Sequence, residues 1–446
     1  MSANRRSLSK YETDVKKEKQ DAGKITRETV KGNQIKQTEP NSYAGREIGT
    51  YCQNGHDKEG HVTNRHKKHY PDTKRYMEFG VIEFRGLGNE TKKSPFVRVH
   101  PETDMESLWT RMTKEWNLDV PKLMISVTGG AKRLNITAKH RQILKKSLMN
   151  AASVSGAWII TGGMATGVME IVGEAIRDLN LTKDTSDKNI VALGIATWGC
   201  VANRESLDGD NQVVNIGNRK ETGNEQEVPL DDNHTHFILV DDGSIRKYGA
   251  EIEIVAKLVK SISKVSLNKN TRTQEEIAEK QSEDLVVPVV TIVVEGGVNT
   301  MKTVLESVNA NIPVLVLQGS GRAADFIAFG YNLPKDKEEF PKDLIEKEAK
   351  TVFEWKPKDK KNQQKNIEKY VKRLKKILEK REMINVFNLN EADTKDIDTA
   401  ILDALLKAKK SSTEAILALA LVYNFSDIAR YEILTRRSRE QWKIIC

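Results

Sequence analysis

Long apolar stretches, cysteine residues and targeting signals are all scarce in this chain of 446 residues. The longest uninterrupted apolar run, Ala415–Tyr423, has nine residues, whereas a membrane-spanning helix needs about 20. The first 45 residues are charged and polar and contain no apolar core of a secretory signal. The three cysteines, Cys52, Cys200 and Cys446, are scattered along the chain, which fits a reducing cytosol. We therefore expect a cytosolic chain that does not cross a membrane by itself.

Motifs of the common enzyme classes are absent as well. The sequence contains no GxSxG, HExxH or DxDxDG motif, no GxGxxG fingerprint and no GxxxxGK[ST] loop. Zinc ligands do gather near the N-terminus, at Cys52, His56, His61, His66 and His69. This stretch has one cysteine, no CxxC pair and no zinc-module spacing, so it is either a metal site or a polar surface segment. We expect no metal site.

The net charge of +9 is concentrated in one segment. Residues 356–382 contain twelve lysines and arginines but only four aspartates and glutamates. Apolar residues recur in this segment at helical spacing, at Ile367, Val371, Leu374 and Leu378. This pattern predicts an amphipathic helix with a solvated basic side. Aromatic residues do not alternate with the basic ones, so we expect an acidic partner or anionic lipid headgroups rather than nucleic acid.

The central part of the chain alternates apolar runs with helical patterns. Six runs are continuously apolar, namely Lys122–Val127, Ala157–Ile160, Asn189–Ile195, Thr235–Val240, Val286–Val294 and Ile312–Leu317. Continuous apolar strands separated by helices are typical of a parallel sheet that is covered on both faces. Two short strands are predicted within residues 76–99, and no element is predicted within residues 203–232, which we interpret as a flexible functional loop.

Each of the six predicted strands ends in a corner that contains glycine. The corners read TGG, TGG, TWG, DDG, EGG and GSGR, beginning at Thr128, Thr161, Thr197, Asp241, Glu295 and Gly319. Glycine lets the backbone approach an anion closely, and a helix that follows directs its N–H groups toward that anion. A single corner is equally well explained as a tight turn. Six corners at one edge of a sheet predict a nucleotide- or phosphate-binding crevice.

Charged residues near these corners suggest how a phosphate is held. Arg322 stands beside Gly319 and Gly321 at the start of a helix, where a guanidinium is able to clamp a phosphate. The alternative is a surface charge at the start of a helix. The carboxylates at the corners, Asp241, Asp242, Glu251 and Glu295, pair with no histidine in the sequence, and His234 and His236 precede a strand, which favours a structural role.

Five segments in order resemble one known family. The segments LMISVTGGAK, GAWIITGGMATGVMEIVGEAIRD, NHTHFILVDDG, EGGVNT and GSGRAADFI resemble the amino-terminal cytosolic homology region of melastatin-type transient receptor potential (TRPM) channels. The resemblance implies an α/β, Rossmann-like (SLOG-type) parallel sheet in residues 50–330, after a disordered leader at 1–49. A charged helical linker at 331–395 and the start of an all-α helical repeat array at 396–446 are expected to follow.

The sequence also resembles, more distantly, the phosphoribohydrolases of the same superfamily, known as the lonely-guy enzymes. Those hydrolases contain the motif PGGxGTxxE, in which the final glutamate is catalytic. This chain reads EGGVNTMKT, with Asn299 in place of the second glycine element and Thr303 in place of the glutamate. Without that carboxylate, assistance to glycosidic cleavage is lost. The resemblance therefore implies a binding domain and not an enzyme.

Within the TRPM family, the insertions look most like the ADP-ribose-gated, Ca²⁺-permeable member. This implies a ligand-sensing regulatory domain of a non-selective cation channel, with ADP-ribose or a related nucleotide as ligand and no catalytic cofactor. Other subunits of a homotetramer would be its partners, at the cytoplasmic face of the plasma membrane. Ca²⁺ would be the permeant and co-activating ion of the full channel. The alternative is a structural assembly domain with a vestigial crevice.

The resemblance and the glycine corners together give the predicted ligand-binding residues. They are Thr128, Gly129, Gly130, Ala131, Gly162, Gly163, Thr166, Met169, Tyr248, Glu295, Gly296, Gly297, Thr300, Gly319, Ser320, Gly321 and Arg322. One departure from the family member is Val255, which stands where that member has a second arginine. Arg246 and Lys257 are the candidates to replace it.

Overall fold

The computed structural model describes most of residues 77–408, and every described residue lies in the second of two compact units, His56–Cys446. The residues within this range that are not described are 86–90, 132–133, 135, 156, 183–189, 208–211, 217–225, 267–285, 335–340, 354–359 and 392–396. The predicted leader, the cysteine- and histidine-containing stretch, and the predicted repeat helices after residue 408 lie outside the described residues.

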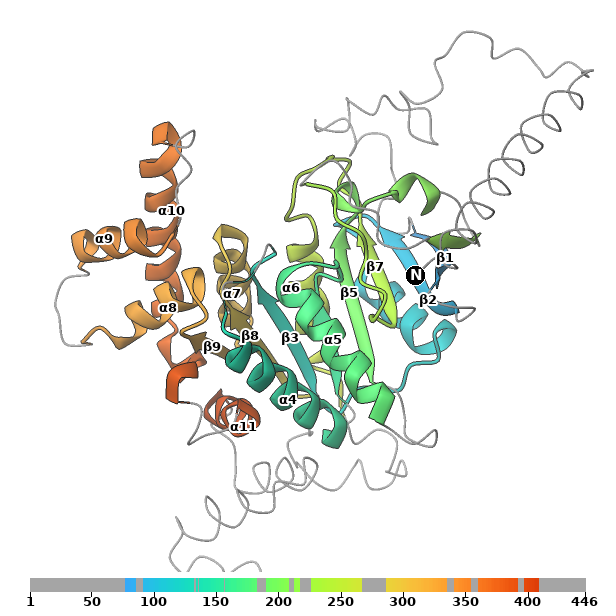
Figure 1. Ribbon diagram of the computed structural model, residues 1–446, viewed down its shortest axis with the longest axis horizontal. Helices are drawn as coiled ribbons and strands as arrows, with labels where there is room; N and C mark the ends of the chain where they lie inside the picture. Colours follow the sequence, from blue (N-terminus) through green and yellow to red (C-terminus); the bar gives the residue numbers. More distant parts are fainter. Residues whose placement is uncertain are drawn as a thin grey trace, which may run out of the picture. The chain divides into compact units, whose positions relative to one another are not determined.

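The described residues form a sheet of ten strands in the order β10-β9-β8-β3-β4-β5-β7-β2-β1-β6 (Figure 1). The strands are β1 (Met77–Arg85), β2 (Thr91–Val99), β3 (Met124–Gly129), β4 (Trp158–Thr161), β5 (Val191–Thr197), β6 (Gln212–Ile216), β7 (His236–Val240), β8 (Val289–Val294), β9 (Val314–Gln318) and β10 (Ile384–Asn388). β1 and β2 are antiparallel, and every other neighbouring pair is parallel. The prediction of a mostly parallel α/β sheet is therefore confirmed.

The helices cover both faces of this sheet. They are α3 (Met105–Thr110), α4 (Ala138–Ser155), α5 (Gly167–Thr182), α6 (Glu251–Ile262), α7 (Val298–Asn309), α8 (Arg322–Asn332), α9 (Lys342–Val352), α10 (Lys360–Leu378) and α11 (Ile397–Ala408). One apolar core joins one face of the strands to α4, α5 and α11, and α4 and α5 cross in front of the strands in Figure 1. Two further cores join the other face to α3 and α6, and to α7, α8, α9 and α10.

The six predicted strands are the six central ones. In chain order they are β3, β4, β5, β7, β8 and β9, and they are neighbours in the sheet order β9-β8-β3-β4-β5-β7. All six residues of β8 are buried, as a strand covered on both faces requires. The carboxyl ends of these parallel strands therefore lie at the same edge, and the six glycine corners follow them there.

The outer parts of the sheet differ from the prediction. β6 lies within residues 203–232, where no element was expected, and it pairs with β1. β10 lies within the predicted linker 331–395 and pairs with β9. The helices α9 and α10 of that linker share a core with α8, and Ile367, Val371 and Leu374 of the predicted amphipathic helix are buried in it. The sheet domain therefore continues past residue 330.

The predicted start of a helical repeat array is not confirmed. Its first helix, α11, packs against α4 and against the strands β8, β9 and β10. Ile401, Leu402 and Leu405 are buried in the same core as α4 and α5. Because α11 covers the sheet, it belongs to the α/β domain rather than to a separate helical layer.

Burial of His236 at the start of β7 predicts a loss of stability in acid. Burial lowers the pKa of His236 from 6.5 to about 4, and its ring packs against Trp116 at a centroid distance of 5.0 Å. Between these two pKa values the unfolded chain binds a proton that the folded chain does not bind, so the free energy of unfolding falls as the pH falls from 6.5 to 4. At about 1.4 kcal/mol for each pKa unit, the loss is roughly 3 kcal/mol.

The measurement is denaturant unfolding at pH 7, 5 and 4 for the wild-type chain and for His236→Gln. Other groups titrate in both proteins, so the difference between the two curves isolates His236. The variant should lose less stability than the wild type over this interval. Parallel curves for the two proteins would show that His236 is not responsible for the acid sensitivity.

Candidate functional site

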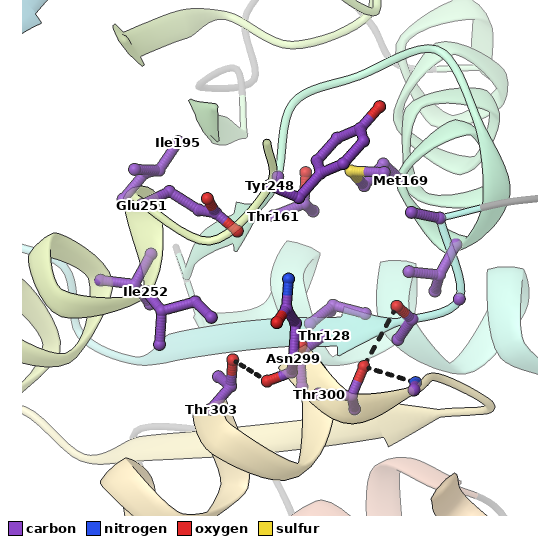
Figure 2. A pocket seen from close by; sticks show the side chains of 18 of the residues that line it. Thr128, Thr161, Met169, Ile195, Tyr248, Glu251, Ile252, Asn299, Thr300 and Thr303 are labelled. Carbon is purple, nitrogen blue, oxygen red and sulfur yellow. Dashed lines mark hydrogen bonds between the residues drawn. The ribbon is translucent and has the colours of Figure 1, made fainter. Parts of the chain in front are cut away.

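A pocket of about 380 Å³ opens at the carboxyl edge of the sheet (Figure 2). The corners after β3, β4 and β5 form its floor, and the first turns of α5, α6, α7 and α8 form its walls. Thr128, Thr161 and Thr197 are the corner residues that contribute hydroxyl groups. The volume lies near the lower end of the range of about 300–1,000 Å³ that is common for small-molecule sites.

Glycine is required where the β3 corner meets the start of α5. Gly167 has a φ of 61°, and a side chain there would collide with the carbonyl oxygen of Gly130. The two segments are joined by hydrogen bonds from the Val168 N–H to the Gly130 oxygen (3.0 Å) and from the Thr166 hydroxyl to the Ala131 oxygen (3.0 Å). These glycines therefore allow the close backbone contact that shapes one wall of the pocket.

Arg322 stands at one end of the pocket. Its Nη1 lies 3.8 Å from Oε2 of the buried Glu295, which is longer than a hydrogen bond. A side chain on Gly297 would place its Cβ 3.4 Å from the guanidinium Nη2, so the absence of one keeps this space open. The Arg322 Nε is buried, and within the described residues it has no hydrogen-bond acceptor.

The backbone at this end is strained. Arg322 and Glu295 have φ values of 45° and 56°, in the left-handed region that residues other than glycine rarely adopt. Such conformations persist where the surroundings hold them, and they often occur at binding sites. Here they place the guanidinium of Arg322 beside Gly297 and the hydroxyl of Tyr370.

Tyr370 completes this end from α10. Its ring stacks on Phe353 at 3.9 Å between centroids. Burial raises the pKa of the Tyr370 phenol, although the positive charges of Arg322 and Arg373 oppose this rise. Arg373 Nη1 donates a hydrogen bond to the Val298 oxygen at 2.6 Å, which ties α10 to the first turn of α7. The phenol therefore stays protonated near neutral pH and offers a hydrogen-bond donor.

The other end of the pocket is lined by the segment that leads into α6. Tyr248 comes from this segment and Glu251 is the first residue of α6. Figure 2 shows the Tyr248 ring next to Met169. Burial raises the pKa of the Tyr248 phenol to about 12, with smaller contributions from Cys200 and Glu251. Glu251 accepts hydrogen bonds from the Thr197 hydroxyl and from the Gly249 N–H. Among the described lining residues, Glu251 and Arg322 are the charged ones.

A chain of buried hydrogen bonds holds the glycine corner that follows β4. Asp231 Oδ2 lies 2.8 Å from Nδ1 of His234, and the His234 Nε2 lies 2.7 Å from the Thr161 hydroxyl. The Gly163 N–H donates to the same hydroxyl at 2.9 Å. Because Asp231 and His234 are fully buried, this chain of contacts gives His234 the structural role that its place in the sequence favours.

Comparison with known proteins identifies the family. A family model described as SLOG in TRPM matches residues 94–373, which is more than half of the chain. The chain belongs to this family. The predicted Rossmann-like fold of SLOG type is consistent with the match, and so is the resemblance to TRPM channels.

The relatives are much longer than this chain. It is 37% identical over 374 residues to the transient receptor potential cation channel subfamily M member-like 2 of Nematostella vectensis, which covers 82% of this chain and 23% of the relative. It is 37% identical over 378 residues to subfamily M member 2 of Mus musculus, and the match covers 82% of this chain and 24% of that relative. Subfamily M member 1 of Mus musculus is 35% identical over 375 residues, and the match covers 83% of this chain and 21% of that relative. The chain thus spans about a quarter of these relatives, and the identities do not separate one member from another.

Of the predicted ligand residues, the SLOG fold brings ten into the pocket. They are Thr128, Gly129, Gly130, Ala131, Gly162, Met169, Tyr248, Gly297, Thr300 and Arg322. The other seven, Gly163, Thr166, Glu295, Gly296, Gly319, Ser320 and Gly321, lie near it but do not line it. In the corner after β9, the Ser320 hydroxyl is used in hydrogen bonds within the protein, since it accepts from the Glu295 N–H and donates to the Leu317 oxygen. That these residues bind a ligand stays a prediction.

Neither candidate cation for the missing arginine reaches the pocket. Val255 does line it, but Arg246 pairs with Glu227 (3.1 Å). The Lys257 ammonium donates to the Pro101 oxygen (3.1 Å) and pairs with Glu253. That Arg246 or Lys257 replaces the arginine stays a prediction, and in this structure both side chains are held by partners outside the pocket.

Several lining residues were missed as ligand candidates. Glu251 and Ile252 are the first two residues of α6, Asn299 and Thr303 lie in the first two turns of α7 after the EGG corner, and Thr197 lies in a corner itself. Their position in the sequence was a signal that could have found them. Tyr370 comes from α10, far along the chain, and nothing local in the sequence indicated it.

Among the described residues, no group of three or more histidine, cysteine, aspartate or glutamate side chains is placed to hold a metal ion. Cys52, His56 and His61 lie outside the described residues. Among the described helices, none is both long enough and apolar enough to span a membrane.

Proposed function

We propose that this chain is the ligand-sensing regulatory domain of a Ca²⁺-permeable, non-selective cation channel, and that it binds ADP-ribose in the pocket at the carboxyl edge of the sheet. The relatives reported above are cation channels by name. As part of such a channel, the domain would lie at the cytoplasmic face of the plasma membrane and contact other subunits of a homotetramer. Ca²⁺ would pass through the pore and co-activate the full channel.

One observation carries the proposal. Arg322 lines one end of the pocket with a side chain that is 35% exposed, and its Nη1 lies 3.8 Å from Oε2 of Glu295, beyond hydrogen-bond distance. A phosphate oxygen would give the terminal nitrogens of this guanidinium a charge-assisted hydrogen bond, which contributes about 1.5–3 kcal/mol. Gly297 precedes α7 at the same place, where the positive end of the helix dipole favours an anion.

The rest of the pocket suits a nucleoside. Tyr248 and Met169 offer an aromatic ring and an apolar thioether across from Asn299 and Thr303, and Ile252 adds an apolar side chain next to them (Figure 2). A flat, partly apolar base packs well against such a wall. Binding without hydrolysis is proposed because Thr303 takes the place of the catalytic glutamate, and its hydroxyl donates to the Asn299 oxygen at 3.2 Å.

The alternative is an assembly domain whose pocket is vestigial. Val255 favours it, since a pocket with one guanidinium holds a diphosphate less firmly than a pocket with two. In that case the domain would act only through contacts with other subunits.

Calorimetric titration of the full chain with ADP-ribose separates the two functions. Saturable binding is expected for the wild type, and Arg322→Ala should weaken it by about 10- to 100-fold, since a charge-assisted hydrogen bond contributes about 1.5–3 kcal/mol. Arg246→Ala is the matched control, because this exposed arginine pairs with Glu227 outside the pocket. Absence of heat with the folded wild-type chain would favour the assembly domain.

A further inference from the structure

Glu251 presents an unused hydrogen-bond acceptor to the pocket. Its Oε2 is held by the Thr197 hydroxyl and by the Gly249 N–H, the latter at 2.9 Å. Its Oε1 makes no hydrogen bond within the described residues, and the carboxylate points into the pocket in Figure 2. The side chain is therefore fixed in direction by one oxygen while the other remains available.

Asn299 faces the same place from the opposite wall. It lies in the first turn of α7, and its side-chain amide has no hydrogen-bond partner within the described residues. A Cβ on Gly249 would lie 3.5 Å from the Asn299 Nδ2 and 3.8 Å from its Oδ1. The amide of Asn299 and the carboxylate of Glu251 therefore both flank Gly249.

Within this polar group, the carboxylate of Glu251 lies apart from Arg322. The guanidinium of Arg322 is beside Gly297, at the β8 corner, whereas Glu251 is bonded to Thr197, at the β5 corner. Three strand spacings separate β8 from β5 in the sheet order, or roughly 14 Å at about 4.8 Å for each spacing. The pocket therefore has a cationic end and an acceptor end.

We infer that Glu251, assisted by Asn299, selects ligands whose adenosine part presents hydrogen-bond donors away from the phosphates. This inference rests on the proposed function and names the part of the ligand that Glu251 recognises. An ionised carboxylate only accepts hydrogen bonds, so it favours an amino group or a pair of vicinal hydroxyls and repels a second anion. The 6-amino group of adenine and the diol of the adenosine ribose share this chemistry. The same arrangement fixes the orientation of the ligand, with its phosphates toward Arg322.

The first arm of the test uses the wild-type chain and changes the ligand. Calorimetry compares ADP-ribose with the analogue that has a 6-oxo group in place of the 6-amino group, and with the analogue that lacks the 2′-hydroxyl of the adenosine ribose. We expect one of the two to bind at least about tenfold more weakly, which also identifies the donor, because a hydrogen bond to a charged group contributes about 1.5–3 kcal/mol. Equal affinities for all three ligands would overturn the inference.

The second arm changes the protein. Glu251→Gln keeps an oxygen for Thr197 and Gly249 but places a donor where the carboxylate had an acceptor. It should weaken ADP-ribose by about tenfold or more and also reduce the preference for ADP-ribose over the weaker analogue. Glu253→Gln is the control, because Glu253 is two residues further along α6, pairs with Lys257 and does not line the pocket. Thermal unfolding checks that both variants are folded.

The outcomes separate this inference from the proposed function. If the wild type binds ADP-ribose but Glu251→Gln binds it with unchanged affinity and unchanged preference, the inference is wrong and the proposed function stands. If the folded wild type gives no heat with ADP-ribose, the proposed function fails, and the inference fails with it. A change in preference is the informative result, since a variant that only loosened the fold would weaken all three ligands alike.

Discussion

Replacing Arg98 with methionine is expected to lower the free energy of unfolding by about 3–5 kcal/mol, because it removes one partner from a buried ion network. Arg98 on β2 is only 11% exposed, and its Nη2 and Nε lie 2.6 and 3.1 Å from Oδ2 of Asp241. Its Nη1 lies 3.0 Å from Oε2 of Glu78 on β1, and the guanidinium stacks on Trp198 at 4.1 Å. These contacts connect the hairpin of β1 and β2 to the corners after β5 and β7.

The cost arises from the two carboxylates rather than from the lost packing, since methionine fills much of the same space. Without Arg98, Asp241 and Glu78 lose the cation that compensates their burial. Chemical denaturation of the wild type and the variant measures the effect. Arg177→Met is the control, because Arg177 and Asp178 are about half exposed (54% and 48%), and such surface pairs contribute about 0–1 kcal/mol.

A second variant tests the same cause. Adding Asp241→Asn to Arg98→Met removes one of the uncompensated charges and should restore part of the lost stability. If Arg98→Met costs no more than Arg177→Met, the network does not hold the hairpin to the sheet. If the double variant is no more stable than Arg98→Met, the loss comes from packing and not from charge.

The sequence predicted the strands that are buried on both faces, because such strands are continuously apolar. β8 is such a strand, since all its residues are apolar or small enough to be buried between two layers. β6 and β10 were missed for a physical reason, because each is five residues long and lies at an edge of the sheet. Edge strands are specified by the open hydrogen-bonding groups of their neighbours, here β1 and β9, and these groups are distant in the sequence.

The candidate site was predictable to the extent that it is built from local turns. The glycine corners and Arg322 lie next to strand ends, so the parallel order of the strands brings them together at one edge. What the corners do individually was not predictable, because it depends on packing. Asp241 pairs with Arg98, and the Ser320 hydroxyl donates to the Leu317 oxygen within its own turn. Tyr370 enters the pocket only because α10 packs against α7 and α8.

Val255 is the lining residue at which a single change should strengthen ligand binding most. If the pocket binds ADP-ribose as proposed, Val255→Arg adds a second guanidinium to a pocket in which Arg322 is the cationic residue among those described. The affinity should rise by about 10- to 100-fold, since a hydrogen bond to a charged group contributes about 1.5–3 kcal/mol. The gain should shrink as the salt concentration rises, because salt screens partly exposed charges.

Val255→Met is the matched control, because methionine gives an unbranched side chain without a charge. Calorimetric titration with ADP-ribose should show a gain for arginine and little change for methionine. Glu251 is four residues before position 255 on α6, so the new arginine faces a carboxylate at the spacing that favours an ion pair. If Val255→Arg brings no gain, the double variant Glu251→Gln, Val255→Arg shows whether that pair captures the guanidinium. A double variant that binds no more tightly than Glu251→Gln alone would mean that the phosphates do not reach this wall of the pocket.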